Sequence, residues 1–474
     1  MHFLLFPVFT VALCRASQSQ TPLGVVGDNT PGHLCCTVLS KSLPELALHL
    51  PGSLEYDRQQ ETYYLRQQTD LLPFCRVSPA TPSEVALTIK TLTKHACHFS
   101  VRSGGHMGCV GSNTDGGVVL DLGRLDGIDV DKRGISLLSF QHGFGSDNVV
   151  NYQVVLADGS IVDANATFHP DLFWALKLGG TNFGIVTRFD VLTYPLKDVW
   201  SGIRTYPITA HETPQLLDNW ISFTQDSASV KEELQAICLG RHNTHERAIV
   251  WHASLDTSPS APLTLAASII DTTKTTTLLD AIHDLQFNFA DHKRVRWFTF
   301  TTRLDASFLW DVFSRAKEIY DELEHVSGIH WDVLIQPITR GFSAASSETG
   351  ENPFRNVLME SGDDLALVLL SAYWDHRADD EAMYDGMRKL GSWSEDTARQ
   401  RGILNDFIYL NYANEEQPVY ARSVNRDDLA RMRKVKQTYD SEDVLGRLWK
   451  GGFKLPHDSS DEHWGFESAA RTEL

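Results

Sequence analysis

The stretch Val101-Arg-Ser-Gly-Gly-His106, followed by Asp115-Gly-Gly-Val-Val-Leu-Asp-Leu122, decides how this sequence folds. A strand-like segment runs into two glycines, which permit a tight turn and bring backbone N–H groups close to an anion. Such a turn can bind a phosphate without net positive charge. Its spacing fits neither GxGxxG nor the P-loop, which excludes the Rossmann and P-loop nucleotide sites. The alternative is an ordinary Gly-Gly turn without a ligand.

Helix and strand signals continue on both sides of this turn. A helix is expected to begin after Thr81, since Pro82 suits a first turn and Glu84 completes a capping box. Asp158-Gly159 predicts a hairpin between strands at 152–157 and 160–162. Further strands are expected at 99–101, 117–122 and 185–191, and a short helix at 170–178.

After Pro195 the sequence changes in character, because longer apolar strands now alternate with amphipathic helices. Strands are expected at 295–301, 329–338 and 365–373, and helices at 214–223, 306–324 and 379–394. This pattern predicts a second α+β domain, in which one sheet carries helices on one face.

The chain is acidic, with 42 Lys and Arg against 61 Asp and Glu and a net charge of −19 over 474 residues. Such a surface repels phosphate backbones and anionic lipid, so neither nucleic acid nor a membrane is expected as a partner. An apolar run from Phe3 to Cys14, followed by Ala16 and Ser17, predicts a signal peptide over residues 1–17 and a secreted protein.

Secretion favours disulfides, and six cysteines remain after the signal peptide. The adjacent Cys35 and Cys36 are expected to take different partners, with Cys75 and Cys97 as the candidates, and the sequence leaves the pairing open. The sequon Asn165-Ala-Thr167 predicts a glycosylation site. The spacing of Cys and His shows no metal-site pattern.

Together with four other stretches, the Gly-Gly-His turn resembles the flavin-binding domain of the p-cresol-methylhydroxylase and vanillyl-alcohol-oxidase type. The closer resemblance is to the fungal berberine-bridge-enzyme-like oxidoreductases. The other stretches are 35–36 with 73–75, 147–159, 171–186, and 409–412 with 439–440. The resemblance implies an α+β fold, with a two-part flavin-binding domain and an α+β substrate domain built on an antiparallel sheet.

The resemblance also implies a division of the chain. The expected parts are an N-terminal segment (18–68), an FAD-binding domain (69–195), a substrate domain (196–405), a return to the flavin domain (406–456) and a tail (457–474).

Several residues acquire roles from the resemblance. His106 would bond covalently to FAD, and the pyrophosphate would be lined by Arg102, Ser103, Gly104 and Gly105. Gly184, Ile185 and Val186 would contact FAD from the far side of the pocket. Asn411 and Tyr412 would contact it from the C-terminal return to the flavin domain.

Tyr409 would be the base in substrate oxidation, with Asn411 and Gln336 beside the substrate. Strand alternation independently places Tyr409 and Asn411 on one face. A phenol beside a hydride-donating carbon is a plausible base once the flavin and burial shift its pKa. The alternative for Tyr409 is a packed sheet aromatic, and for Gln336 it is structural packing.

One stretch departs from the family. Between Arg133 and Gly134 the chain lacks a strand, a helix and a Gly-rich stretch, a loss of about 30 residues or more. This removes half of the expected pyrophosphate cradle. Lys132–Gly134 can span at most about 10 Å, so a strand ending near Val130 and a strand expected at 135–140 must be neighbours or the sheet must rearrange.

The sequence therefore predicts an FAD-dependent oxidoreductase. It would pass hydride from a small organic substrate, a secondary metabolite or a carbohydrate, to flavin, with dioxygen as acceptor. The alternative is a shortened relative that binds flavin poorly and is not catalytic. A secreted hydrolase lacks support, because the sequence has no GxSxG elbow.

Overall fold

The computed structural model describes residues 31–109, 111–127, 137–195, 197–226, 232–242, 245–256, 268–286, 293–342, 351–360 and 362–456. The expected signal peptide, the Arg133–Gly134 join and the expected tail lie outside these residues. Within them, no helix combines the length and the apolar character needed to cross a bilayer.

The largest element is a nine-stranded antiparallel sheet, in the order β11-β8-β10-β9-β14-β15-β13-β16 with β12 also on β8. Its strands are β8 (Val199–Pro207), β9 (Glu233–His242), β10 (His245–Ser254), β11 (Ile270–Asp271), β12 (Lys274–Thr276), β13 (Arg294–Arg303), β14 (His330–Ile338), β15 (Leu365–Trp374) and β16 (Leu404–Asn405). The strands expected at β13, β14 and β15 are confirmed. The expectation missed β8, β9 and β10, where polar residues interrupt the apolar pattern.

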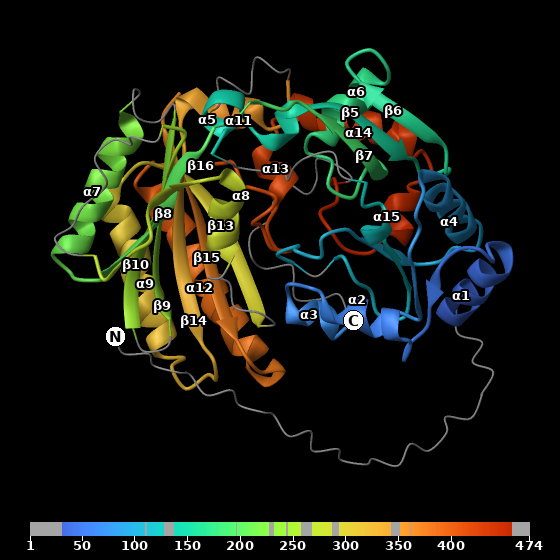
Figure 1. Ribbon diagram of the computed structural model, residues 1–474, viewed down its shortest axis with the longest axis horizontal. Helices are drawn as coiled ribbons and strands as arrows, with labels where there is room; N and C mark the ends of the chain where they lie inside the picture. Colours follow the sequence, from blue (N-terminus) through green and yellow to red (C-terminus); the bar gives the residue numbers. More distant parts are fainter. Residues whose placement is uncertain are drawn as a thin grey trace, which may run out of the picture.

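Three helices cover one face of this sheet: α7 (Glu212–Gln225), α9 (Ala306–Asp321) and α12 (Asp380–Gln400). Helical spacing directs Leu216, Leu217 and Trp220 of α7 into the core, where they meet sheet residues such as Trp331. Figure 1 shows the sheet and its helices on one side of the molecule, with the N-terminal half on the other. A short helix, α8 (Leu278–Gln286), lies beside β8. The α+β architecture of this part, with its antiparallel sheet, is as expected.

The N-terminal half holds two smaller sheets. One has the order β1-β2-β4-β3 and consists of β1 (Leu48–His49), β2 (Cys75–Val77), β4 (Val118–Asp121) and β3 (Phe99–Arg102), of which β2, β4 and β3 run parallel. The other has the order β6-β5-β7 and consists of β6 (Ile161–Asn165), β5 (Val149–Val155) and β7 (Ile185–Val191). The expected hairpin is present, with Gly159 at φ +74° in its turn.

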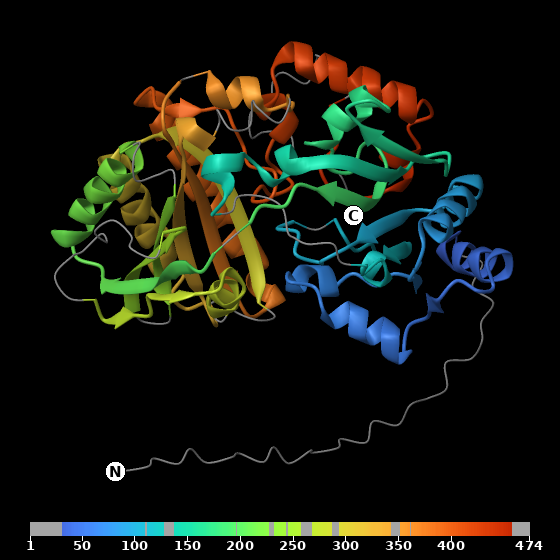
Figure 2. The ribbon, with the colours of Figure 1, turned by 45° about the horizontal axis from the view of Figure 1, so that its top comes forward.

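Further helices come from the N-terminal half of the chain and from the segments after β14. They are α1 (Pro31–Ser42), α2 (Leu54–Glu61), α3 (Arg66–Thr69), α4 (Pro82–Lys94), α5 (Ser139–His142), α6 (Pro170–Leu176), α11 (Arg355–Met359), α13 (Val419–Ser423), α14 (Arg426–Tyr439) and α15 (Val444–Leu448). α4 begins as expected, since Thr81 Oγ1 accepts from the Glu84 backbone N–H. Figure 2 shows α14 beside the sheet of β5, β6 and β7, so the C-terminal segment returns to the N-terminal half.

The strand expected at 135–140 is wrong over its described part. Leu137 and Leu138 form a turn, and α5 begins at Ser139. The N–H of Gly143 donates to the Ser139 carbonyl at 2.8 Å, so the backbone is satisfied locally. A segment without a partner strand can satisfy its backbone N–H and C=O groups by local hydrogen bonds of this kind, in place of hydrogen bonds between strands.

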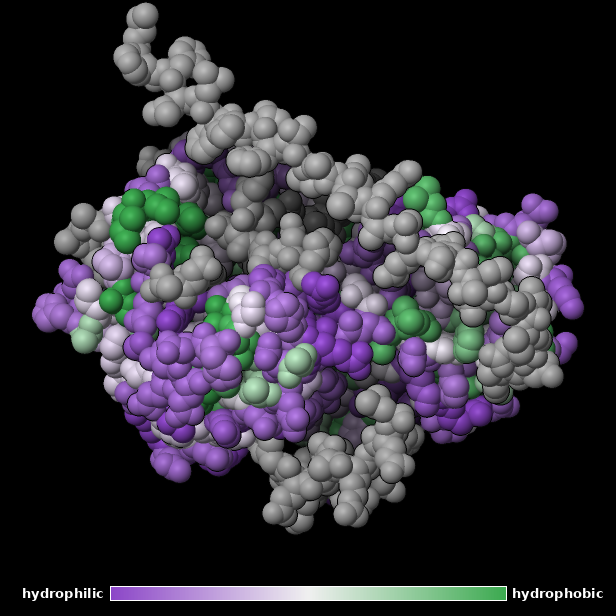
Figure 3. All heavy atoms as spheres, turned by 90° about the horizontal axis from the view of Figure 1, so that it is seen from below, coloured by the Kyte–Doolittle hydropathy of each residue, from purple (hydrophilic) through white to green (hydrophobic). Residues whose placement is uncertain are grey.

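The face drawn in Figure 3 is mostly hydrophilic, with hydrophobic residues in separate patches. The large apolar side chains lie instead in the cores, where Trp220, Phe300 and Phe308 are fully buried.

The N-terminal segment is fixed to the first small sheet by two disulfides. Cys35 bonds to Cys97 and Cys36 to Cys75, with Cα–Cα distances of 5.9 and 6.0 Å. The structure thus selects one of the two pairings that the sequence left open. Cys109 and Cys238 are buried free thiols.

Replacing Cys36 and Cys75 together by Ser is expected to lower the free energy of unfolding by about 2–5 kcal/mol, because the loop between them is no longer closed in the unfolded chain. Urea denaturation measures this loss. Peptide mapping without reduction checks the pairing, and four free thiols at these positions would contradict it.

Candidate active site

The Gly-Gly turn follows β3 and is held from below by Arg102. Its guanidinium pairs with Asp121 at 2.5 Å and donates to the Thr62 hydroxyl at 2.7 Å. Arg102 is only 8% exposed. These partners take its two terminal nitrogens, whereas the buried Nε has no hydrogen-bond partner and lies beside the turn, since a Cβ on Gly105 would come 3.1 Å from it.

The backbone of the turn itself is open. Gly105 has φ +68°, a left-handed value that favours glycine, and a Cβ placed on Gly104 would meet nothing within 4 Å. Ser103, Gly104 and His106 are exposed. A phosphate-sized anion can therefore approach these N–H groups, and this side of the site fits the pyrophosphate of FAD.

The predicted far side is more tightly packed. Gly184 precedes β7, and a Cβ on it would lie 2.5 Å from Val154 Cγ1 of β5. Ile185 is 2% exposed in the apolar core of the N-terminal half. The glycine here permits close packing of β7 on β5, and FAD contacts from Gly184, Ile185 and Val186 stay a prediction.

Aromatic rings connect His106 to the large sheet. The imidazole stacks on Tyr64, with ring centroids 4.0 Å apart, and Trp297 of β13 lies 6.2 Å from it. Gly108 sits against Trp297, since a Cβ on Gly108 would come 2.1 Å from the indole. The Tyr64 hydroxyl is 3.4 Å from that of Tyr373 on β15. The predicted flavin-binding turn thus meets the sheet of the predicted substrate domain.

The strand expected at Tyr409–Tyr412 is wrong. This segment is a turn, in which the N–H groups of Tyr412 and Ala413 donate to the Tyr409 carbonyl at 2.9 and 3.1 Å. These local hydrogen bonds replace the hydrogen bonds of a sheet, so the alternation of side chains along a strand does not apply to this segment. Tyr409 and Asn411 meet nevertheless, because Asn411 Nδ2 donates to the Tyr409 hydroxyl at 2.9 Å.

The predicted substrate residues lie together. The Tyr409 and Tyr412 rings meet edge-on at 5.0 Å, and the Tyr412 hydroxyl donates to Gln336 Oε1 at 2.8 Å. Burial raises the pKa of Tyr412 well above its usual value. Tyr412 therefore keeps its proton for Gln336, whereas Tyr409 presents an oxygen that already accepts an N–H. The role of Tyr409 as the base in substrate oxidation stays a prediction.

Sequence reasoning missed Tyr64, Trp297 and Tyr373. Tyr64 lies 42 residues before His106, and no local motif records their stacking. Helix α3 starts at Arg66, and the Arg66 N–H donates to the Lys293 carbonyl just before β13. The N-terminal segment therefore reaches both the turn and the sheet.

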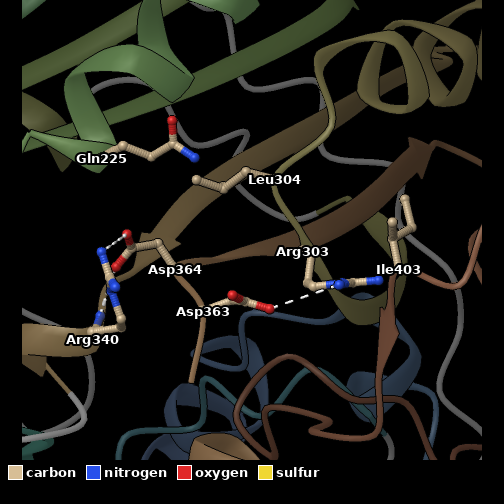
Figure 4. Close-up of a pocket in the computed structure, with 7 residues that line it drawn as sticks. All are labelled: Gln225, Arg303, Leu304, Arg340, Asp363, Asp364 and Ile403. Atoms are coloured by element: carbon tan, nitrogen blue, oxygen red, sulfur yellow. Dashed lines mark hydrogen bonds and ion pairs between the residues drawn. The ribbon is translucent and has the colours of Figure 1, made fainter. Parts of the chain in front are cut away.

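A cavity of about 500 Å³ lies at one end of the large sheet, away from these residues. Figure 4 shows its oppositely charged pairs, Arg303 with Asp363 at 3.8 Å and Arg340 with Asp364 at 3.4 Å. It is also lined by Gln225, Leu304 and Ile403. None of the predicted site residues lines it. In the part of the chain that the structure describes, no group of His, Cys, Asp and Glu could hold a metal ion.

Lys454 ties the C-terminal return to the segment before β7. Its Nζ donates to the carbonyls of Thr181 and Leu445, each at 3.0 Å. Burial lowers the pKa of Lys454 from 10.5 to about 7. Between these two values the unfolded chain binds more protons than the folded chain, so this group makes stability rise with pH.

Lys454→Met is expected to flatten that rise between pH 7 and 10.5. The measurement is the free energy of unfolding in urea at the two ends of this window, compared with the unchanged chain. An identical pH slope in both proteins would show that Lys454 is not the group concerned.

Comparison with known proteins agrees with this geometry. Residues 73–137 match the model of the FAD binding domain family. The FAD-dependent monooxygenase FUP4 of Fusarium proliferatum is 29% identical over 508 aligned positions, covering 91% of this chain and 96% of that protein. The FAD-dependent monooxygenase tpcD of Cochliobolus heterostrophus is 27% identical, and the alignment covers 91% of this chain and 96% of that protein. The 508 aligned positions exceed the 474 residues of this chain, so FUP4 carries residues that this chain lacks.

Solved structures share the fold. 6-Hydroxy-D-nicotine oxidase of Arthrobacter nicotinovorans matches with a TM-score of 0.69 at 18% identity, over 86% of this chain and 97% of that one. Glucooligosaccharide oxidase of Acremonium strictum matches with a TM-score of 0.68 at 18% identity, over 88% of this chain and 98% of that one. Berberine bridge enzyme of Eschscholzia californica matches with a TM-score of 0.65 at 13% identity, over 90% of this chain and 100% of that one. The resemblance seen in the sequence is confirmed: the chain carries a match to the FAD binding domain, is similar to fungal FAD-dependent monooxygenases, and shares the fold of the berberine-bridge-enzyme-like oxidases.

Proposed function

We propose that this protein oxidises a small organic substrate, a secondary metabolite or a carbohydrate, with FAD as cofactor and dioxygen as acceptor. The proposal is carried by one observation, the contact between the residues Tyr409, Asn411, Tyr412 and Gln336. The Tyr412 ring contacts Trp297, and the Trp297 ring in turn lies close to His106. When bound, FAD supplies the hydride acceptor.

The residues have separate roles in this proposal. The turn 103–106 holds the pyrophosphate, and His106 is the point of covalent attachment. Glucooligosaccharide oxidase, one of the solved proteins with this fold, carries a 6-S-cysteinyl, 8α-N1-histidyl FAD. Tyr409, as its phenolate, takes the substrate proton, Asn411 donates to its oxygen, and Gln336 with Tyr412 positions the substrate.

The fungal relatives are named monooxygenases. Oxidase and monooxygenase reactions both consume dioxygen, but only an oxidase returns one hydrogen peroxide for each dioxygen consumed. Parallel oxygen-electrode and peroxide assays on flavin-loaded protein therefore test the proposal. A one-to-one ratio supports it, and oxygen consumption without peroxide would overturn it in favour of a monooxygenase.

We further propose that the chain as it stands binds FAD weakly. The open turn at Gly104 provides one side of the cradle, while the Gly-rich stretch expected opposite is missing from the sequence. The longer aligned length of FUP4 supports a shortened chain. Flavin absorbance per polypeptide after purification tests this, and stoichiometric flavin would contradict it.

Secretion and glycosylation complete the proposal. The two disulfides support an oxidising compartment. Asn165 ends β6 on a partly exposed turn, and its side-chain oxygen accepts from the Thr167 hydroxyl at 2.9 Å. A mass shift on treatment with an amidase that removes N-linked sugars, abolished in Asn165→Gln, is the expected result for secreted protein.

A further inference from the structure

One edge of β13 lacks a partner strand over most of its length, and we call it the free edge of β13. β15 pairs with the other edge along the whole strand, whereas β16 pairs with the free edge only at Thr301 and Thr302 in the described part of the chain. The backbone N–H and C=O groups of alternate residues point out of such an edge. Val295, Trp297 and Thr299 are buried there, so these groups need other partners.

Side-chain amides take the place of the missing strand. Gln67 Nε2 donates to the Val295 carbonyl at 2.8 Å, and Gln67 Oε1 accepts from the Val295 N–H at 3.2 Å. Four residues along the strand, Gln417 binds the carbonyl and the N–H of Thr299 in the same way, at 2.7 and 3.1 Å. Each glutamine therefore satisfies both backbone groups of one residue on the free edge.

The two glutamines come from the two sides of the candidate site. Gln67 lies on α3, which closely follows Tyr64, and the Tyr64 ring stacks on His106. Figure 1 shows α3 beside the end of β13. Gln417 follows the turn that begins at Tyr409. One strand edge thus holds both the segment that contacts His106 and the segment that contains Tyr409.

The segment that contains Tyr409 is a closed loop, residues 408–423, which we call the Tyr409 loop. Ser423 Oγ closes its base, because it accepts from the Ile408 N–H at 2.8 Å and donates to the Ile408 carbonyl at 3.0 Å. In the middle of the loop, Asn414 Nδ2 donates to the Trp297 carbonyl at 2.6 Å. The loop therefore contacts the free edge of β13 through side chains at its middle.

Ion pairs repeat this arrangement. Arg294 of β13 pairs with Asp70, just after α3, at 2.7 Å. Arg296 pairs with Glu415 and Glu416 of the Tyr409 loop, at 2.5 and 2.9 Å. Both arginines are buried. Such pairs are a weak source of net stability, and their best-attested use is to fix a register.

We propose that the free edge of β13 aligns the two sides of the active site, with Gln67 and Gln417 as positioning residues. Gln67 sets where Tyr64 meets His106, and Gln417 sets where Tyr409 lies. Their two binding points are four residues apart on one strand, a spacing of about 13 Å. This inference rests on the proposed function, which places flavin at His106 and the proton acceptor at Tyr409.

The first test is amide hydrogen exchange on the full chain as purified. Gln417→Leu and Gln67→Leu are matched controls for each other, because each removes one amide from the same edge. Gln417→Leu is expected to speed exchange in the Tyr409 loop about tenfold or more and to leave residues 62–68 unchanged, and Gln67→Leu is expected to do the reverse. Equal effects of either variant on both segments, or no effect, would overturn the inference.

Gln417→Glu separates hydrogen bonding from packing. A neutral carboxyl keeps one donor and one acceptor, as the amide does, whereas a carboxylate can only accept. Exchange in the Tyr409 loop, relative to the unchanged chain, should therefore be raised in this variant and fall back as the pH is lowered through the titration of the new carboxyl. A ratio that stays raised at every pH would contradict the role given to Gln417.

The second test is the rate of flavin reduction at saturating substrate in flavin-loaded protein. Gln417→Leu is expected to lower this rate about 10–100-fold at unchanged flavin content, because a displacement of about 1 Å in the reacting groups is enough for such a loss. An unchanged rate in a variant whose Tyr409 loop exchanges faster would overturn the positioning role. A chain that shows the two separate exchange effects but forms no product overturns the proposed function alone.

Discussion

Tyr409→Phe is expected to slow substrate oxidation by about 10²–10⁴-fold, because the variant lacks the group that takes the substrate proton. The ring should stay in place, since Tyr409 packs among apolar rings that include Phe144 and Phe407, with only 8% of it exposed. Flavin content should not change. The measurement is the rate of flavin reduction at saturating substrate, followed by stopped flow on flavin-loaded protein.

Tyr412→Phe is the control for this experiment. It removes a hydroxyl 2.8 Å from Gln336 Oε1 but leaves the proposed base intact. Its effect should fall mainly on KM, because it disturbs substrate positioning. An unchanged reduction rate in Tyr409→Phe would remove Tyr409 from the chemistry and leave it a packed aromatic.

Insertion of a family-like Gly-rich segment between Arg133 and Gly134 is expected to give yellow, soluble protein where the unchanged chain gives little bound flavin. The insertion restores the side of the cradle opposite Gly104 and supplies partner strands. Strands without partners expose backbone groups and favour aggregation. The measurements are flavin per polypeptide and the midpoint of thermal unfolding.

A flexible Gly/Ser insertion of the same length at the same place separates chain length from restored structure. It should recover neither flavin nor thermal stability. Equal recovery with both insertions would show that the join itself was the defect, and that the missing strands and glycines do not matter.

Local patterns predicted the elements whose physics is local. The Thr81 cap, the Asp158-Gly159 hairpin and the apolar run of β15 each depend on neighbours in sequence, and each is present. The helix expected at 214–223 is present as α7, and its Trp220 is fully buried. The fold class could therefore be predicted from the sequence.

Contacts between distant residues could not be predicted. The place of Arg102 at the pyrophosphate stays a prediction, and its ion pair with Asp121 on the neighbouring strand was not foreseen. The strand interpretation of Tyr409–Tyr412 failed because two local N–H bonds to the Tyr409 carbonyl close a turn. The stacking of Tyr64 on His106 depends on the path of the whole N-terminal segment, which no short pattern encodes.

The central claim is that the turn ending at His106 is the flavin site. The most direct test is denaturation of the restored chain and of its His106→Ala variant, followed by flavin fluorescence on the separated polypeptide. We expect flavin to remain on the restored chain, to be absent from His106→Ala, and to be weak or absent on the 474-residue chain. Equal covalent flavin with and without His106 would contradict the claim.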